Sequence, residues 1–159
     1  MVMKRVAALL LSTLAFTPPV QSATSPSPKK LIVLTNRGTP VNKMSTGQLR
    51  DILLGQLPEW SNKRPVTVLL VDDQSLVRAL RAILKMSKGD YENHFVVSQY
   101  RGAEVVKPKL FRTQEAALQY LTSTPGAIAV LEGEPDMTVG GAKAIRIDGK
   151  LPDEEGYRY

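Results

Sequence analysis

Short apolar runs rich in β-branched residues alternate along this chain with segments that carry the signals of a helix start. The runs lie at 31–34, 66–71, 127–131 and 143–147, and turn-forming residues bound them. A short continuous apolar run predicts a strand that is buried on both faces. Strands that alternate with helices at such short intervals are typical of an α/β sandwich with a mostly parallel sheet. We therefore expect this fold class.

Four segments are predicted to be helices because a capping residue precedes apolar residues at helical spacing. The capping positions are Ser45, the pair Asp72 and Asp73, Ser87 and Thr113. Ser45 has Gln48 three residues later, which is the pattern of a capping box. The segment 99–112 shows no clear period and is rich in Arg and Lys, so we expect a connecting loop there.

The N-terminal residues follow the order of a secretory signal peptide. Two basic residues precede an apolar stretch at 6–16, and small residues follow a Thr-Pro-Pro break. The stretch is too short to cross a bilayer as a helix, which takes roughly 20 apolar residues. We predict a leader over 1–22, a flexible tether over 23–30 and a folded domain over 31–159. The predicted mature chain has no transmembrane segment, and we expect it in the periplasm.

Charge and residue content exclude several classes of function. The leader contains two basic residues and no acidic one, so its removal lowers the formal net charge from +6 to +4. This excess is mild, so nucleic acid is not an expected partner. The chain has no cysteine and one histidine, His94, which excludes thiolate and two-histidine metal sites. Because no dinucleotide fingerprint or phosphate-binding glycine loop occurs either, we expect no metal, no cofactor and no enzymatic activity.

Polar side chains follow the predicted strands in three loops. In parallel sheets, ligands bind at the carboxyl ends of strands, where helix N-termini present free amides. The loops hold hydroxyl, amide and guanidinium groups, which suit a small oxyanion. The predicted ligand-binding residues are Thr35, Asn36, Asp72, Ser75 and Arg101, with Asp72 as an acceptor for a protonated oxyanion. Turn formation, helix capping and simple solvation are the alternative roles of these residues.

Five segments, taken in order, carry a resemblance to a known family. They are 45–60 with Leu49, Gly55 and Trp60, then 87–95, Tyr100-Arg101-Gly102, Thr124-Pro-Gly-Ala-Ile128 and 145–157. Their order and spacing over 31–157 resemble the phosphate-binding-protein-like domains of transporter substrate-binding proteins, which have the type 2 periplasmic binding fold. The resemblance implies two small α/β lobes with a ligand cleft between them, which would close over the ligand.

The same resemblance implies an exported solute-binding protein that holds a small, phosphate-like oxyanion in the interlobe cleft, with a permease as partner if it serves ABC transport. A second hypothesis is an accessory or sensory module of the cell envelope, which binds a protein and no small ligand. Its basic residues Arg101, Lys107, Lys109 and Arg112 would then dock an acidic protein or lipid surface. A third hypothesis, a hydrolase that uses His94 and a serine, rests on that histidine alone.

Overall fold

The computed structural model describes residues 29–134 and 139–159. The predicted leader at 1–22, and all but the last residues of the predicted tether at 23–30, lie outside the described residues and stay predictions. Within the part of the chain that is described, no helix is both long enough and apolar enough to span a membrane.

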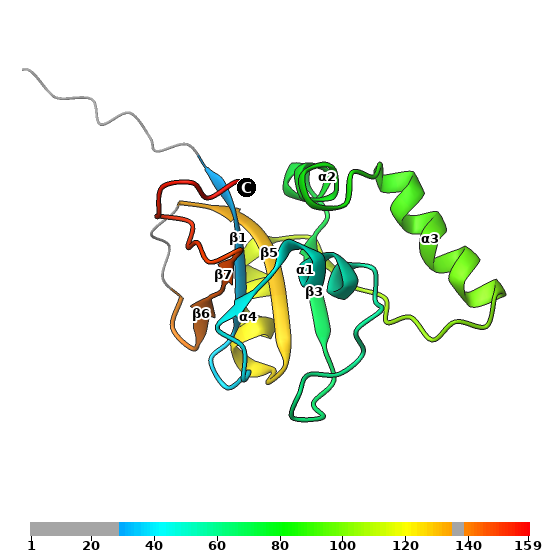
Figure 1. Ribbon diagram of the computed structural model, residues 1–159, viewed down its shortest axis with the longest axis horizontal. Helices are drawn as coiled ribbons and strands as arrows, with labels where there is room; N and C mark the ends of the chain where they lie inside the picture. Colours follow the sequence, from blue (N-terminus) through cyan, green and yellow to red (C-terminus); the bar gives the residue numbers. More distant parts are fainter. Residues whose placement is uncertain (1–28, 135–138) are drawn as a thin grey trace, which may run out of the picture.

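A five-stranded sheet forms the centre of the molecule, with the strand order β4-β3-β5-β1-β6. Figure 1 labels β3, β5, β1 and β6 of this sheet. Its strands are β1 (Lys30–Asn36), β3 (Thr67–Val71), β4 (Lys109–Phe111), β5 (Ala127–Gly133) and β6 (Ala142–Ala144). β3 pairs in parallel with β4 and β5, whereas β1 pairs antiparallel with β5 and β6. Four strands therefore run in one direction and β1 alone runs against them. This confirms the predicted α/β class with a mostly parallel sheet.

Two segments differ from the predicted elements. The predicted last strand at 143–147 is divided, because β6 pairs with β1 while β7 (Arg146–Ile147) pairs in parallel with β2 (Lys43–Met44) in a small second sheet. In addition, β4 lies within 99–112, where a loop was expected. Both differences concern strands of two or three residues, which are too short to show a hydrophobic period.

All four predicted helices form. They are α1 (Thr46–Leu53), α2 (Gln74–Ala79), α3 (Lys88–Tyr100) and α4 (Gln114–Ser123). Their N-caps Ser45, Asp73, Ser87 and Thr113 each accept a hydrogen bond from a backbone N–H of the first turn. The predicted capping box at Ser45 is confirmed. α2 continues directly into a π-helical turn, η1 (Leu80–Leu84).

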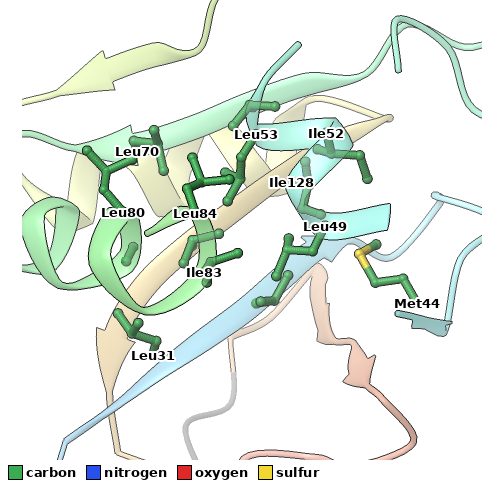
Figure 2. Close-up of a cluster of buried hydrophobic side chains, with 14 of the residues drawn as sticks. Leu31, Met44, Leu49, Ile52, Leu53, Leu70, Leu80, Ile83, Leu84 and Ile128 are labelled. Atoms are coloured by element: carbon green, nitrogen blue, oxygen red, sulfur yellow. The ribbon is translucent and has the colours of Figure 1, made fainter. Parts of the chain in front are cut away.

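Helices cover both faces of the main sheet, and neighbouring residues of β1 enter different cores. Leu31 and Val33 pack in a cluster with side chains from α1, α2, η1 and α3. Figure 2 shows Leu31 together with the labelled leucines and isoleucines of α1 and η1. Ile32 and Leu34 pack on the other face, in a cluster that includes Leu121 of α4. Since side chains alternate between the faces of a strand, this places β1 between two layers of helices, buried on both sides as predicted.

The long-range pairing of β1 with β5 joins the first and last long strands over six residue pairs. Residues 29–134 and 139–159 are thereby arranged around one main sheet of five strands, with a sheet of two strands beside it. The cleft between two lobes that the resemblance implies stays a prediction.

Two of the segments that carry the family resemblance meet at the turn before β5. The indole N–H of Trp60 donates a hydrogen bond to the carbonyl oxygen of Gly126 at 2.8 Å. Gly126 has a φ of 88°, and a Cβ atom there would lie 2.5 Å from the carbonyl oxygen of Pro65. Only glycine fits this turn without displacing the backbone, so this part of the motif has a structural role.

Candidate functional site

Thr35 and Asn36 lie at the carboxyl end of β1, and both are buried, with 0% and 7% of their surface exposed. The Thr35 hydroxyl donates a hydrogen bond to the carbonyl oxygen of Ala127 at 2.8 Å. The Asn36 amide donates to the carbonyl oxygens of Leu121 and Thr122, both at 2.9 Å, and its Oδ1 accepts the N–H of Gly38. The two side chains therefore fasten β1 to β5 and to the last turn of α4.

Asp72 and Ser75 follow β3, at the start of α2. The Asp72 carboxylate forms an ion pair with the ammonium group of Lys88, the first residue of α3. This hydrogen bond with Asp72 raises the pKa of Lys88. Asp73 accepts the backbone N–H of Ser75 at 2.7 Å, so it caps α2, and the Ser75 side chain is buried. These groups hold α2 and α3 at the end of β3.

The structure does not bring these two pairs of residues together. Thr35 is level with Ile128 of β5, and so is Val68 of β3. Asp72 directly follows β3, four residues after Val68, which is about 13 Å at the rise of a strand. The prediction assumed that the first strand runs parallel to the others. Because β1 runs antiparallel to them, its carboxyl end lies beside the amino ends of the other strands.

Arg101 lies at a third place, at the C-terminal end of α3. Lys88 begins this helix beside Asp72, and its 13 residues separate Arg101 from Lys88 by about 20 Å. Arg101 lines a surface cavity of about 520 Å³ together with Asn93, His94 and Ser98 of the same helix. The five predicted ligand-binding residues therefore occupy three separate places.

His94 has a packing role in this structure. Its Nε2 lies 3.0 Å from the carbonyl oxygen of Leu54, and its ring packs edge-on against Phe95 at 5.0 Å between centroids. The described residues contain no group of three or more His, Cys, Asp or Glu side chains placed to hold a metal ion.

Sequence reasoning missed a groove between α3 and the strand β4. The groove has a volume of about 280 Å³ and contains apolar side chains of Leu76, Tyr91, Phe95, Val96 and Leu110. Val96 is 47% exposed and Leu110 is 51% exposed, although both are large and apolar. The sequence feature that corresponds to this groove is the run Lys-Leu-Phe at 109–111. In it a polar residue is followed by apolar ones, but three residues are too few to predict a strand.

Two basic residues line this groove, and two more follow on the chain. Lys88 and Lys107 line it, and Lys109 and Arg112 lie beside it on the chain. The Lys109 ammonium group lies 5.6 Å above the ring of Tyr120, and Glu92 is the acidic residue among the lining side chains. Among the described residues, Lys107 has no hydrogen-bond or ion-pair partner. The groove thus joins exposed apolar surface with the unpaired positive charge of Lys107, while the charge of Lys88 is paired with Asp72.

Three hydrogen bonds connect α3 and the segment before β4 to the C-terminal end of α1. The Tyr91 hydroxyl donates to the carbonyl oxygen of Leu53 at 2.6 Å, and burial raises the pKa of Tyr91. The His94 ring contacts Leu54, and the N–H of Val106 donates to the carbonyl oxygen of Gly55 at 3.0 Å. These bonds fix α3 and the segment before β4 against α1, while Val96 and Leu110 of the groove stay exposed.

Comparisons with known proteins show the class of fold. No family model and no curated protein matches the chain. Among solved structures, an ABC-type phosphate transport receptor from Vibrio cholerae is 15% identical, with a TM-score of 0.51, over 78% of this chain and 48% of that chain. PstS from Borrelia burgdorferi is 12% identical, with a TM-score of 0.58, over 78% and 49%. A possible phosphate binding protein from Planctomyces limnophilus is 14% identical, with a TM-score of 0.54, over 75% and 41%.

These likenesses confirm the predicted resemblance at the level of fold. The chain has an α/β fold similar to that of phosphate ABC transporter substrate-binding proteins. It spans about half the length of the solved structures that it matches. That proportion agrees with the arrangement of the described residues around one main sheet.

Proposed function

We propose that this chain is a non-enzymatic module of the substrate-binding fold that acts by binding a protein of the cell envelope. The observation that carries the proposal is the exposed apolar groove between α3 and β4, with the two basic residues that line it. Exposed apolar side chains gathered in one patch mark interaction sites, whereas single ones are ordinary. The predicted leader supports an exported, periplasmic location, where such a partner would be met.

The internal contacts of the predicted ligand residues also support this proposal. Thr35 donates a hydrogen bond to the carbonyl oxygen of Ala127, and Asn36 donates to carbonyl oxygens of α4. Asp72 is paired with Lys88. A small anion would have to displace these bonds to use the same groups. The groove side chains Val96 and Leu110 need no such displacement to meet a partner.

Site-specific crosslinking in the native host tests this function. A photo-reactive amino acid replaces Val96 in one variant and Leu57 in a matched control. Leu57 is also an exposed large apolar residue, 38% exposed, but it lies beside Trp60 in a different cavity. We expect a discrete crosslinked envelope protein with the variant at position 96 and none with the variant at position 57. Equal crosslinking from both positions would contradict the proposal.

Binding of a small oxyanion is a second candidate function, and the cavity beside Arg101 favours it. The guanidinium group there lies among the polar side chains of Asn93, His94 and Ser98, a mixture that can bind an anion. The similar solved structures include a phosphate transport receptor and a substrate-binding protein with bound phosphate. The Asp90 carboxylate also lines this cavity and opposes a fully ionised anion, so this candidate ranks second.

Thermal melting with phosphate and sulfate tests the second candidate. An anion present at about 100 times its dissociation constant would stabilise the fold by about 2.7 kcal/mol. The shift should disappear in Arg101→Ala and persist in Arg81→Ala, since Arg81 is an exposed arginine that lines a different cavity. Such a result, without a crosslink at position 96, would replace the docking function by solute binding.

A further inference from the structure

The outer edge of β4 is an unpaired edge of the main sheet. Among residues 29–134 and 139–159, β4 is the first strand in the sheet order and has only β3 as a neighbour. The carbonyl oxygen of Phe111 accepts the N–H of Asp72 at 2.8 Å, so the backbone groups of Phe111 face β3. Backbone groups alternate between the two edges of a strand, so those of Leu110 face outward. This edge can accept a further strand.

Side chains of β4 alternate in a way that places one of them in the groove. Leu110 lines the groove beside Val96 of α3. On the other face, the Phe111 ring packs on Tyr120 of α4 at 5.5 Å between centroids, and Lys109 lies above the same ring. A strand added beside Leu110 would therefore place every second side chain over the apolar groove.

Resting on the proposed function, we infer that the partner enters as an extended segment in which apolar residues alternate with Asp or Glu. Its backbone pairs with Leu110 at the edge of β4, and its apolar side chains enter the groove next to Val96 and Phe95. Its carboxylates lie on the face of β4 that carries Lys109, while Lys107, which has no partner among the described residues, adds positive charge at the groove itself. Main-chain hydrogen bonds would hold the segment, and the groove would set its register.

The charge of this edge argues against a second copy of the same chain as the occupant. Two β4 edges brought together would set the Lys107, Lys109 and Arg112 side chains of one chain against those of the other. Like charges placed opposite one another on paired strands are destabilising, and lysines at an edge act against self-association. An acidic segment has the complementary charge.

Fluorescence anisotropy with a defined peptide tests the inference. The probe is the fluorescein-labelled peptide Glu-Val-Asp-Leu-Glu-Val-Asp-Leu, and the matched peptide carries Lys at each acidic position. We expect saturable binding of the acidic peptide below about 1 mM, weakened about tenfold by Leu110→Glu and unchanged by Leu57→Glu. The exposed substitutions Val96→Ser and Lys107→Glu should each weaken binding about fivefold, so a folding defect of one variant does not decide the test.

Methylation of single peptide amides separates strand pairing from other binding modes. We expect loss of binding when every second amide is methylated and little change at the positions between, because only alternate N–H groups face β4. Uniform tolerance of methylation overturns the inference, as does a peptide that does not bind. Binding to anionic phosphatidylglycerol vesicles, or a dimer dissociated by Leu110→Glu, in place of peptide binding would overturn it as well.

The crosslinking result keeps this inference distinct from the proposed function. A partner crosslinked at position 96, combined with failure of the acidic peptide, would leave the docking function in place and reject the extended acidic segment. Failure of both the position-specific crosslink and the peptide would reject the docking function itself. Success of both assigns the groove and the edge of β4 to one binding site.

Discussion

At the centre of the main sheet, β1 and β5 pair over six residues, and the polar side chains at the end of β1 are bonded inside the fold. At the margin, β4 pairs with β3 over three residues, and apolar side chains of β4 and α3 are half exposed. The polar groups of the centre thus serve the fold, while the apolar groups of the margin are available to a partner. Residue type alone would suggest the reverse.

The largest difference between the two regions should appear in a matched pair of leucine substitutions. Leu121→Ala empties a fully buried site in the core between α4 and the sheet, at an expected cost of about 3 kcal/mol in the free energy of unfolding. Leu110→Ala removes a half-exposed side chain and should cost less than about 1 kcal/mol. Chemical denaturation measures both. Equal costs would show that the margin is packed as tightly as the centre.

The next largest effect concerns Asn36, which the structure places in the interior. Asn36→Ala removes the donor to two carbonyl oxygens of α4 and the acceptor for the N–H of Gly38, and it should cost about 3 kcal/mol or slightly less. Asn93→Ala, on the exposed side of α3, is the matched control and should change stability by less than about 0.5 kcal/mol. A small cost at Asn36 together with a lost response to phosphate would instead make it a ligand residue.

Asn36 shows what could be predicted from the sequence and what could not. The helix starts were predicted correctly because capping is local: Ser45 and Gln48 decide it within four residues. The long strands were also predicted, since a run such as 127–131 is apolar throughout. The direction of β1 depends on its pairing with β5, about 90 residues away, and no local pattern encodes it.

The separation of the predicted ligand-binding residues follows from the direction of that single strand. If β1 ran parallel to β3, Asn36 and Asp72 would lie at the same end of the strands, as predicted. The antiparallel pairing separates them and turns Asn36 toward the end of α4. The groove was missed for a related reason, because β4 is recognisable as a strand only through its pairing with β3.

The hydrogen bond that attaches α3 to α1 should make an intermediate contribution to the free energy of unfolding. Tyr91→Phe keeps the ring and removes the hydrogen bond to the carbonyl oxygen of Leu53, so it should cost about 1 kcal/mol. Tyr100→Phe is the control, since Tyr100 is almost fully exposed, and it should cost close to nothing. Thermal denaturation with hydrogen exchange of α3 measures both. A Tyr91→Phe variant with unchanged protection in α3 would show that other contacts hold the helix.

The exposed carboxylate of Asp148 tests whether an exposed side chain can also stabilise the fold. The Thr46 hydroxyl donates to the exposed Asp148 carboxylate at 2.6 Å and the Thr46 N–H donates at 2.9 Å, and these bonds lower the pKa of Asp148. A lowered pKa means that the stabilisation is present above the unfolded pKa of about 3.9 and is lost as pH falls through the folded value. Because the group is exposed, the effect should stay below about 1 kcal/mol.

Asp148→Asn measures this effect, and asparagine tolerates the φ of 50° at this position. We expect the variant to be less stable than the wild type at pH 7 and equal to it at pH values well below about 4. Glu155→Gln, a neighbouring exposed carboxylate for which the structure shows no bond, is the control. A stability difference that does not change with pH would show that the loss at Asp148 is not one of charge.

The smallest expected effect on stability belongs to the margin itself. Val96→Ser replaces a half-exposed side chain on α3, and the two residues have similar helix propensities, so stability should change by about 0.5 kcal/mol or less. The same substitution should weaken binding of the acidic peptide, because Val96 forms one wall of the groove. A side chain that contributes little to the fold and much to binding is what distinguishes the margin from the centre. If Val96→Ser unfolds the domain instead, the groove belongs to the core and the comparison fails.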